Sequence, residues 1–144
     1  MSNQIRPLAI CIFRDGNRIL VGEGYDPVKR ETFYRPLGGG IEYGERAEDA
    51  LRRELREEIG AEAASLQYLF TLENIFTFNG ATGHEIVMIF DGALADESLY
   101  SQEIIEGREF DGFRHAPLKA LWKPIAEFGA HAPLYPDGLL ERLK

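Results

Sequence analysis

Three glutamates in the middle of the chain have the spacing of a shared oxygen-ligand site. Glu54, Glu57 and Glu58 lie in a stretch, residues 45–59, that contains no Gly or Pro. At about 100° per residue on a helix, Glu58 lies about 40° from Glu54, and Glu57 lies about 60° from it on the other side. Like charges at this spacing repel one another, so a compensating cation is expected. Magnesium and manganese prefer oxygen ligands and share them with phosphates and water in phosphoryl chemistry.

A run of three glycines, Gly38 to Gly40, stands in front of this stretch. Glycine lets the backbone approach a ligand closely and can turn a carbonyl or an N–H toward a metal ion or a phosphate. Together with Pro36, the run predicts a loop. No Gly-Lys-Ser/Thr follows it, so the phosphate loop of ATPases and GTPases is excluded.

The stretch from Gly39 to Ala61 resembles the Nudix box, a motif of glycines, glutamates and an Arg-Glu pair at fixed spacing. At about 6 to 7% average usage, a chance match of its seven specified non-aliphatic positions is on the order of one in 10⁸ per starting point. Two positions depart from the usual pattern, since Ala61 is small and Leu37 replaces a proline often found there. The residues at the required spacing are Gly39, Glu45, Arg53, Glu54, Leu55, Glu57, Glu58 and Gly60.

The resemblance implies hydrolysis of a nucleoside diphosphate linked to another moiety, with Mg²⁺ or Mn²⁺ as cofactor. Nucleoside triphosphates, ADP-sugars and dinucleoside polyphosphates all stay open as substrates. In this sequence the implied catalytic residues are Glu54, Glu57 and Arg53, with Arg53 orienting the acidic cluster and Glu54 sometimes assigned as the base. Glu45 would brace the loop against the helix. The implied metal ligands are Gly39, through its carbonyl, and Glu54, Glu57 and Glu58.

Outside the box, three residues are weaker candidates for the site. Arg35 stands just before the glycine run, where it could contact a substrate phosphate. Glu106 is the preferred extra ligand or base in a polar stretch that also holds Glu103 and Glu109. Glu85 is a second candidate, at the start of an expected strand. For each of them, an ordinary surface position is the alternative.

Two other interpretations compete with an enzyme. A helix rich in Glu and Arg is often only a solvated face with ion pairs one turn apart, but the box spacing argues against this. A catalytically silent Nudix fold could serve as a nucleotide sensor. A sensor would be free to lose one of the three carboxylates, and this chain keeps all of them. We therefore favour the enzyme.

The elements that must position these residues are strands and helices. Strands on both sides of one long helix favour a mixed α/β domain. The resemblance implies a Nudix-type α/β/α sandwich with a mixed sheet and a central catalytic helix, as one domain over residues 1–144. We expect hairpins from 8–13 with 19–21 and from 68–78 with 85–90, an extended segment over 33–36, a helix over 45–59 ended by Gly60, a strand over 110–114, and short helices over 118–122 and 138–143.

Length and charge narrow the class of protein further. The 144 residues predict one domain, and a single cysteine, Cys11, excludes an intrachain disulfide and favours a reducing, cytoplasmic setting. No apolar run approaches the roughly 20 residues that span a bilayer, so we expect no membrane partner. The net charge of −8 repels nucleic-acid backbones. The expected partner is a small nucleotide rather than a nucleic-acid polymer, and a homodimer formed through exposed strand edges stays open.

Overall fold

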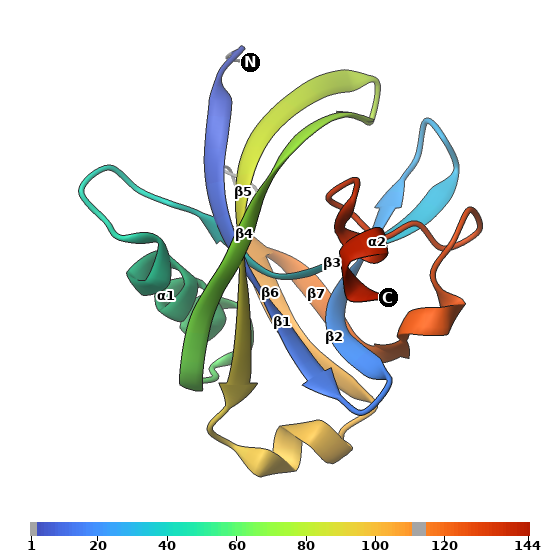
Figure 1. Cartoon of the computed structure of the whole chain (residues 1–144). Coiled ribbons are helices and arrows are strands. Elements are labelled where there is room, and N and C mark those ends of the chain that lie inside the picture. The colour runs from blue at the N-terminus through green and yellow to red at the C-terminus, as the bar shows by residue number, and fades with distance from the viewer. Residues whose placement is uncertain (1–2, 111–114) are drawn as a thin grey trace.

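In the computed structural model, which describes residues 3–110 and 115–144, seven strands form one sheet in the order β4-β5-β1-β3-β2-β7-β6 (Figure 1). β1 and β5 run parallel, whereas the other neighbouring strands run antiparallel, so the sheet is mixed. The strands are β1 (Ile5–Asp15), β2 (Arg18–Asp26), β3 (Glu31–Gly40), β4 (Ala63–Phe78), β5 (Ala81–Leu94), β6 (Ile104–Phe110) and β7 (His115–Pro124); the helices are α1 (Ala47–Ile59) and α2 (Leu139–Leu143), with 3-10 turns at Glu97–Ser101 and Ile125–Glu127.

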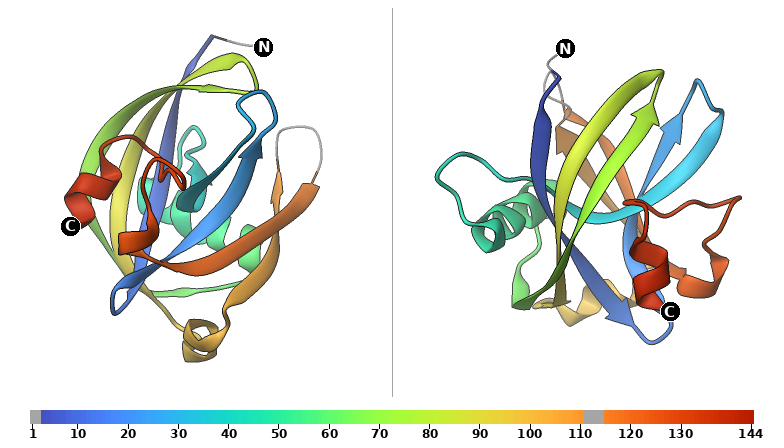
Figure 2. Two further views of the ribbon diagram at one scale, coloured as in Figure 1. Left: turned by 90° about the vertical axis from the view of Figure 1, so that its right-hand side faces the viewer. Right: turned by 45° about the horizontal axis from the view of Figure 1, so that its top comes forward.

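Apolar side chains cover both faces of the sheet because successive residues of a strand point to opposite faces. In β1, Ala9, Cys11 and Phe13 pack into one core with Leu51 and Leu55 of α1. The intervening β1 residues pack into a second core that includes residues of α2. Figures 1 and 2 show α1 and α2 on opposite sides of the sheet. The expected mixed α/β architecture is confirmed.

The helix expected over 45–59 is confirmed as α1, which begins two residues later. Glu42 and Glu45 form a turn before it, in which the Glu45 N–H donates to the Glu42 carbonyl at 2.9 Å. Leu51 and Leu55 are fully buried and hold the helix on the sheet. Gly60 ends the helix in the left-handed conformation, with φ of 65°, which a residue without a Cβ adopts at little cost.

The loop expected at the glycine run is wrong, because Gly38 to Gly40 continue β3 and pair with β1. Gly38 has φ of 143°, and a Cβ at this position would lie 2.1 Å from the carbonyl oxygen of Ala9. Glycine is therefore required here for two strands to approach each other. The rule that glycines interrupt strands fails where the strand needs a close backbone contact.

The short helix expected over 118–122 is also wrong, because these residues belong to β7. Leu118, Ala120 and Trp122 are buried in alternation, which is the period of a strand, and β7 pairs with both β2 and β6. Of the strand expected over 110–114, residues 111–114 lie outside the described residues. The helix expected over 138–143 is confirmed as α2.

Both expected hairpins are confirmed, and their strands are longer than the sequence indicated. β1 and β2 pair at Arg14 with Ile19, next to the turn, and β4 and β5 pair from Phe78 with Ala81 onward. Along the described ranges, none of the helices has the length and apolar character needed to cross a membrane.

Candidate active site

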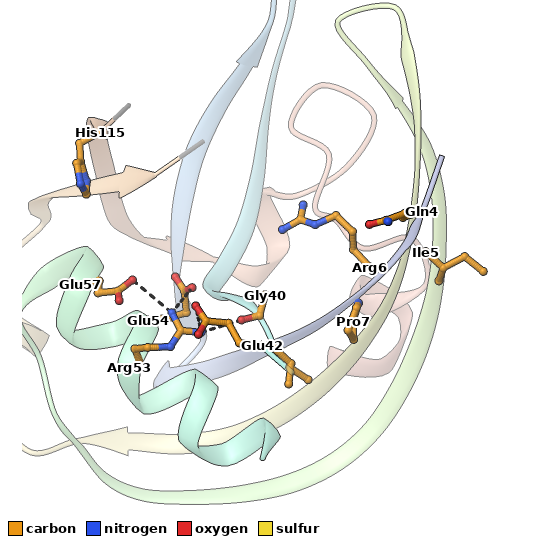
Figure 3. Close-up of a pocket in the computed structure, with 11 residues that line it drawn as sticks. Gln4, Ile5, Arg6, Pro7, Gly40, Glu42, Arg53, Glu54, Glu57 and His115 are labelled. Atoms are coloured by element: carbon orange, nitrogen blue, oxygen red, sulfur yellow. Dashed lines mark hydrogen bonds and ion pairs between the residues drawn. The ribbon is translucent and has the colours of Figure 1, made fainter. Parts of the chain in front are cut away.

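Arg53, in the middle of α1, ties the helix to the segment before it and to the end of β3 (Figure 3). Its Nε and Nη2 donate to the two carboxylate oxygens of Glu45 at 2.8 and 2.9 Å. Its Nη1 donates to Glu54 at 3.0 Å and to Glu57 at 3.4 Å, and Nη2 also donates to the carbonyl of Gly40 at 2.9 Å. A guanidinium has five N–H groups, and these contacts use all of them. Arg53 therefore positions the carboxylates and keeps no donor for a substrate.

Glu45 braces the segment before α1 against the helix. Besides the two bonds from Arg53, its carboxylate accepts the N–H of Glu42 at 3.1 Å. The Arg53 guanidinium and this N–H hold the pKa of Glu45 at about 2, well below its ordinary value. The carboxylate is thus charged throughout the physiological range, as a structural ion pair requires.

Glu54 and Gly39 are in close contact where α1 meets β3. A Cβ at Gly39 would lie 2.5 Å from the carboxyl carbon of Glu54, so any side chain at this position would displace the carboxylate from its present place. Glu54 is half-buried, and burial raises its pKa, although Arg53 opposes the rise. The contact places a carboxylate beside the backbone of the residue whose carbonyl the box pattern implies as a ligand.

Glu58 points from α1 toward the backbone of β3. Its Oε1 accepts the N–H of Gly38 at 3.2 Å. Burial, and then the charge of Glu54, raise the pKa of Glu58 to about 8, against the opposing influence of Arg35 and the Gly38 N–H. A cation bound between Glu54 and Glu58 would offset the repulsion between them.

Gly107 of β6 packs against the last turn of α1. A Cβ at Gly107 would lie 2.0 Å from the carbonyl oxygen of Glu58. The edge strand therefore reaches the acidic turn of the helix only because this residue has no side chain. Sequence analysis missed Gly107, and the signal that marks it is a glycine inside a strand, which often indicates a close backbone approach.

A cleft of about 950 Å³ opens beside these carboxylates. Arg53, Glu54 and Glu57, which the box pattern implies as catalytic residues, lie in its wall, but the pattern gave no indication of Arg6 from β1 or of His115 from β7. The cleft is lined by Gln4, Ile5, Arg6, Pro7, Gly40, Ile41, Glu42, Arg53, Glu54, Glu57 and His115 (Figure 3).

The structure does not bring all three weaker candidates, Arg35, Glu85 and Glu106, to the carboxylates of α1. Arg35 is half-buried and close enough to influence the Glu58 carboxyl. Glu85 is buried on the face of the sheet away from α1, where it lines a small cavity with Arg35. Glu106 is exposed and lies opposite Lys119, on the strand face turned away from α1. On β6 it is Glu109, not Glu106, whose charge acts on Glu58.

The donor set suits a hard divalent cation, because carboxylate and carbonyl oxygens are its preferred ligands. With the side chains as they stand, no three His, Cys, Asp or Glu residues in the described ranges are grouped as a metal site. The carboxylates instead accept hydrogen bonds from Arg53 and Gly38. Loading a cation would therefore require carboxylates of this cluster to turn from their present positions.

Comparison with known proteins agrees with the box pattern. A model of the NUDIX domain matches residues 4–138. Over 81 residues the chain is 41% identical to the nucleoside triphosphatase NudI of Escherichia fergusonii, covering 53% of this chain and 55% of that protein. Over 65 residues it is 40% identical to the human mitochondrial NAD(P)H pyrophosphatase NUDT13, covering 45% of this chain and 18% of that protein. The match thus spans about half of one curated relative and much less of the other.

Solved structures show the same fold over nearly the whole chain. A MutT NUDIX hydrolase from Burkholderia pseudomallei superposes with a TM-score of 0.66 at 21% identity, covering 99% of this chain and 100% of that one. A NUDIX hydrolase from Nitrosomonas europaea superposes with a TM-score of 0.64 at 17% identity, covering 97% and 86%. At such identities the likeness concerns the fold alone.

Proposed function

Since the chain belongs to the Nudix hydrolase family, we propose that it is a metal-dependent hydrolase that cleaves the diphosphate bond of a nucleoside diphosphate linked to another moiety. Relatives at about 40% identity are named as a nucleoside triphosphatase and an NAD(P)H pyrophosphatase. Both names describe cleavage of a phosphoric anhydride in a nucleotide. Nucleoside triphosphates, ADP-sugars and dinucleoside polyphosphates are the substrate classes to test.

The observation that carries the proposal is the complete use of Arg53. One guanidinium fixes Glu45, Glu54 and Glu57 together with the Gly40 carbonyl. Such a network orients carboxylates in advance, which lowers the cost of arranging them when a charged ligand arrives. An acidic helix that served only as a solvated face would have no need of it. The network also faces a cleft large enough for a nucleotide.

Glu54, Glu57, Glu58 and the Gly39 carbonyl are the groups that would hold Mg²⁺ or Mn²⁺. When bound, the cation would neutralise the diphosphate, polarise its phosphorus and lower the pKa of water. A chain with a net charge of −8 needs such neutralisation before it binds a polyanion.

The protein's own residues position the reaction. Arg53 keeps Glu54 and Glu57 at the cleft wall, and Gly39 leaves room for the Glu54 carboxylate. Water attacks one phosphorus of the diphosphate, the bond from that phosphorus to the bridging oxygen breaks, and the bridging oxygen leaves on the other phosphate. The proton of the attacking water passes to a carboxylate, for which Glu54 is our candidate because it lines the cleft and burial raises its pKa, whereas Glu58 does not line the cleft.

The test is incubation with Mg²⁺ and a panel of diphosphate-linked nucleotides in ¹⁸O-water, followed by mass spectrometry of the products. The proposal predicts two phosphorylated products, one of which carries a single ¹⁸O from solvent. Tight binding of a nucleotide without any labelled product across the panel would instead identify a sensor.

A further inference from the structure

Arg6 at the start of β1 stands apart from the arginine that organises the carboxylates. Both residues line the cleft, and Figure 3 shows the Arg6 guanidinium extending from β1 at a place separate from the cluster formed by Arg53, Glu54 and Glu57. Its side chain is 62% exposed. Its Nη2 lies 3.4 Å from the position that a Cβ of Gly40 would take. The two guanidinium groups therefore flank one residue, Gly40, which accepts a bond from Arg53.

Fewer guanidinium N–H groups are used in contacts within the described residues by Arg6 than by Arg53. Its one ion pair in the described ranges is with Glu85, and Nη1 and the carboxylate oxygen are 3.7 Å apart, beyond a good hydrogen bond. Glu85 itself is 6% exposed and lies at the same level of the adjacent parallel strand. A guanidinium held by one distant carboxylate beside an open cleft retains most of its donors for a ligand.

We propose that Arg6 binds the diphosphate of the substrate, donating to non-bridging oxygens of the phosphoryl group that lies farther from the carboxylate cluster. The inference rests on the proposed function and names the basic side chain, Arg6, that binds the phosphate of its substrate. Arginine suits this task because its planar fork matches two phosphate oxygens at once. Arg53 cannot take the role, because all its N–H groups are used within the protein.

The experiment measures binding of inorganic pyrophosphate with Mg²⁺ by titration calorimetry to the full chain and its variants. Arg6→Gln should weaken binding about 30-fold, the typical loss for a charge-assisted hydrogen bond, and Arg6→Lys should recover part of it. Arg56→Gln is the matched control, since Arg56 is similarly exposed at 58% and pairs with one carboxylate, Glu62, away from the cleft. It should bind as the unmodified protein does.

A double variant separates phosphate binding from an effect through Glu85. In Arg6→Gln/Glu85→Gln a neutral amide replaces the buried carboxylate. Any disturbance that arises from leaving the Glu85 charge without its cation is therefore removed. Our inference predicts binding as weak as in Arg6→Gln alone. Recovery to the unmodified affinity would overturn it, as would an affinity of Arg6→Gln within about twofold of the unmodified protein, or no binding of pyrophosphate by the unmodified protein.

The outcomes also separate this inference from the proposed function. If the nucleotide panel is not hydrolysed but Arg6→Gln still loses pyrophosphate affinity, the proposed function fails and the role of Arg6 stands. If the panel is hydrolysed and Arg6→Gln keeps the unmodified KM and pyrophosphate affinity, the role of Arg6 fails and the function stands.

Discussion

Two acidic segments, α1 and β6, touch each other at Gly107, but they differ in how their carboxylates are held. On α1, Glu54 and Glu57 accept bonds from one arginine, and Glu58 accepts a backbone N–H from β3. On β6, Glu106 is exposed and lies opposite Lys119. The difference teaches that the number of carboxylates is not enough to mark a candidate site. The α1 carboxylates differ from those of β6 in the N–H donors and glycines that fix them beside a cleft.

The sharpest test of this contrast is to remove one restrained carboxylate. Glu58→Gln keeps the shape of the side chain but loses a ligand charge, so we expect activity to fall by about 100-fold or more while the protein stays folded. Because the pKa of Glu58 is about 8, the carboxyl is largely protonated in the metal-free protein at neutral pH, and a neutral amide replaces it closely. Steady-state kinetics and thermal melting check both parts. A large drop in melting temperature would point to a structural ion pair instead.

The restraint itself is tested at Gly39. In Gly39→Ala the new Cβ would collide with the Glu54 carboxyl group, so we expect the carboxylate to shift and activity to fall by about 10- to 100-fold. Gly129→Ala is the matched control, because a Cβ at Gly129 meets no atom within 4 Å. If the two variants retain equal activity, the close contact between β3 and α1 has no bearing on the reaction.

These contacts also show which parts of the molecule are readable from sequence. The helix, both hairpins and the Arg53 network were predictable because their signals are local: an uninterrupted run ended by Gly60, a turn at Asn79-Gly80, and fixed spacing in the box. β7 was not, because its strand conformation depends on pairing with β2 and β6, far away in the sequence.

The same reason explains the residues missed at the site. Arg6 reaches the cleft because β1 lies between β3 and β5, and Gly107 matters because β6 folds back onto α1. The strand order leaves no local pattern for Arg6, and the glycine inside β6 indicates a close backbone approach without showing that the partner is α1. Glu106 was preferred over Glu109 because the sequence does not show which residues of β6 face α1. That assignment needs the pairing register of β6.

The raised pKa of Glu58 makes a prediction about pH and stability. The folded pKa of about 8 exceeds the ordinary value of 4.5, so the stabilisation from this group is complete below about pH 4.5 and is lost as pH rises through 8. Relative to Glu58→Gln, the metal-free protein should therefore lose on the order of 3 kcal/mol of unfolding free energy between pH 5 and 8. Urea denaturation of both proteins across this range measures the difference. Parallel pH profiles would show that Glu58 titrates normally.

The smallest effect is expected for Glu106 of β6, the second of the two acidic segments compared above. Glu106→Gln should leave activity within about twofold of the unmodified protein, because an exposed carboxylate facing away from α1 contributes little. The kinetic assay used for Glu58→Gln serves here. A loss of activity approaching that of Glu58→Gln would mean that Glu106 belongs to the site after all.

The most direct test of the central claim is the rate of hydrolysis of the best substrate before and after complete removal of divalent metal. If Glu54, Glu57 and Glu58 act by holding a cation, chelation should abolish turnover, and added Mg²⁺ or Mn²⁺ should restore it. Hydrolysis by the fully chelated protein at the untreated rate would contradict the assignment of these carboxylates as metal ligands.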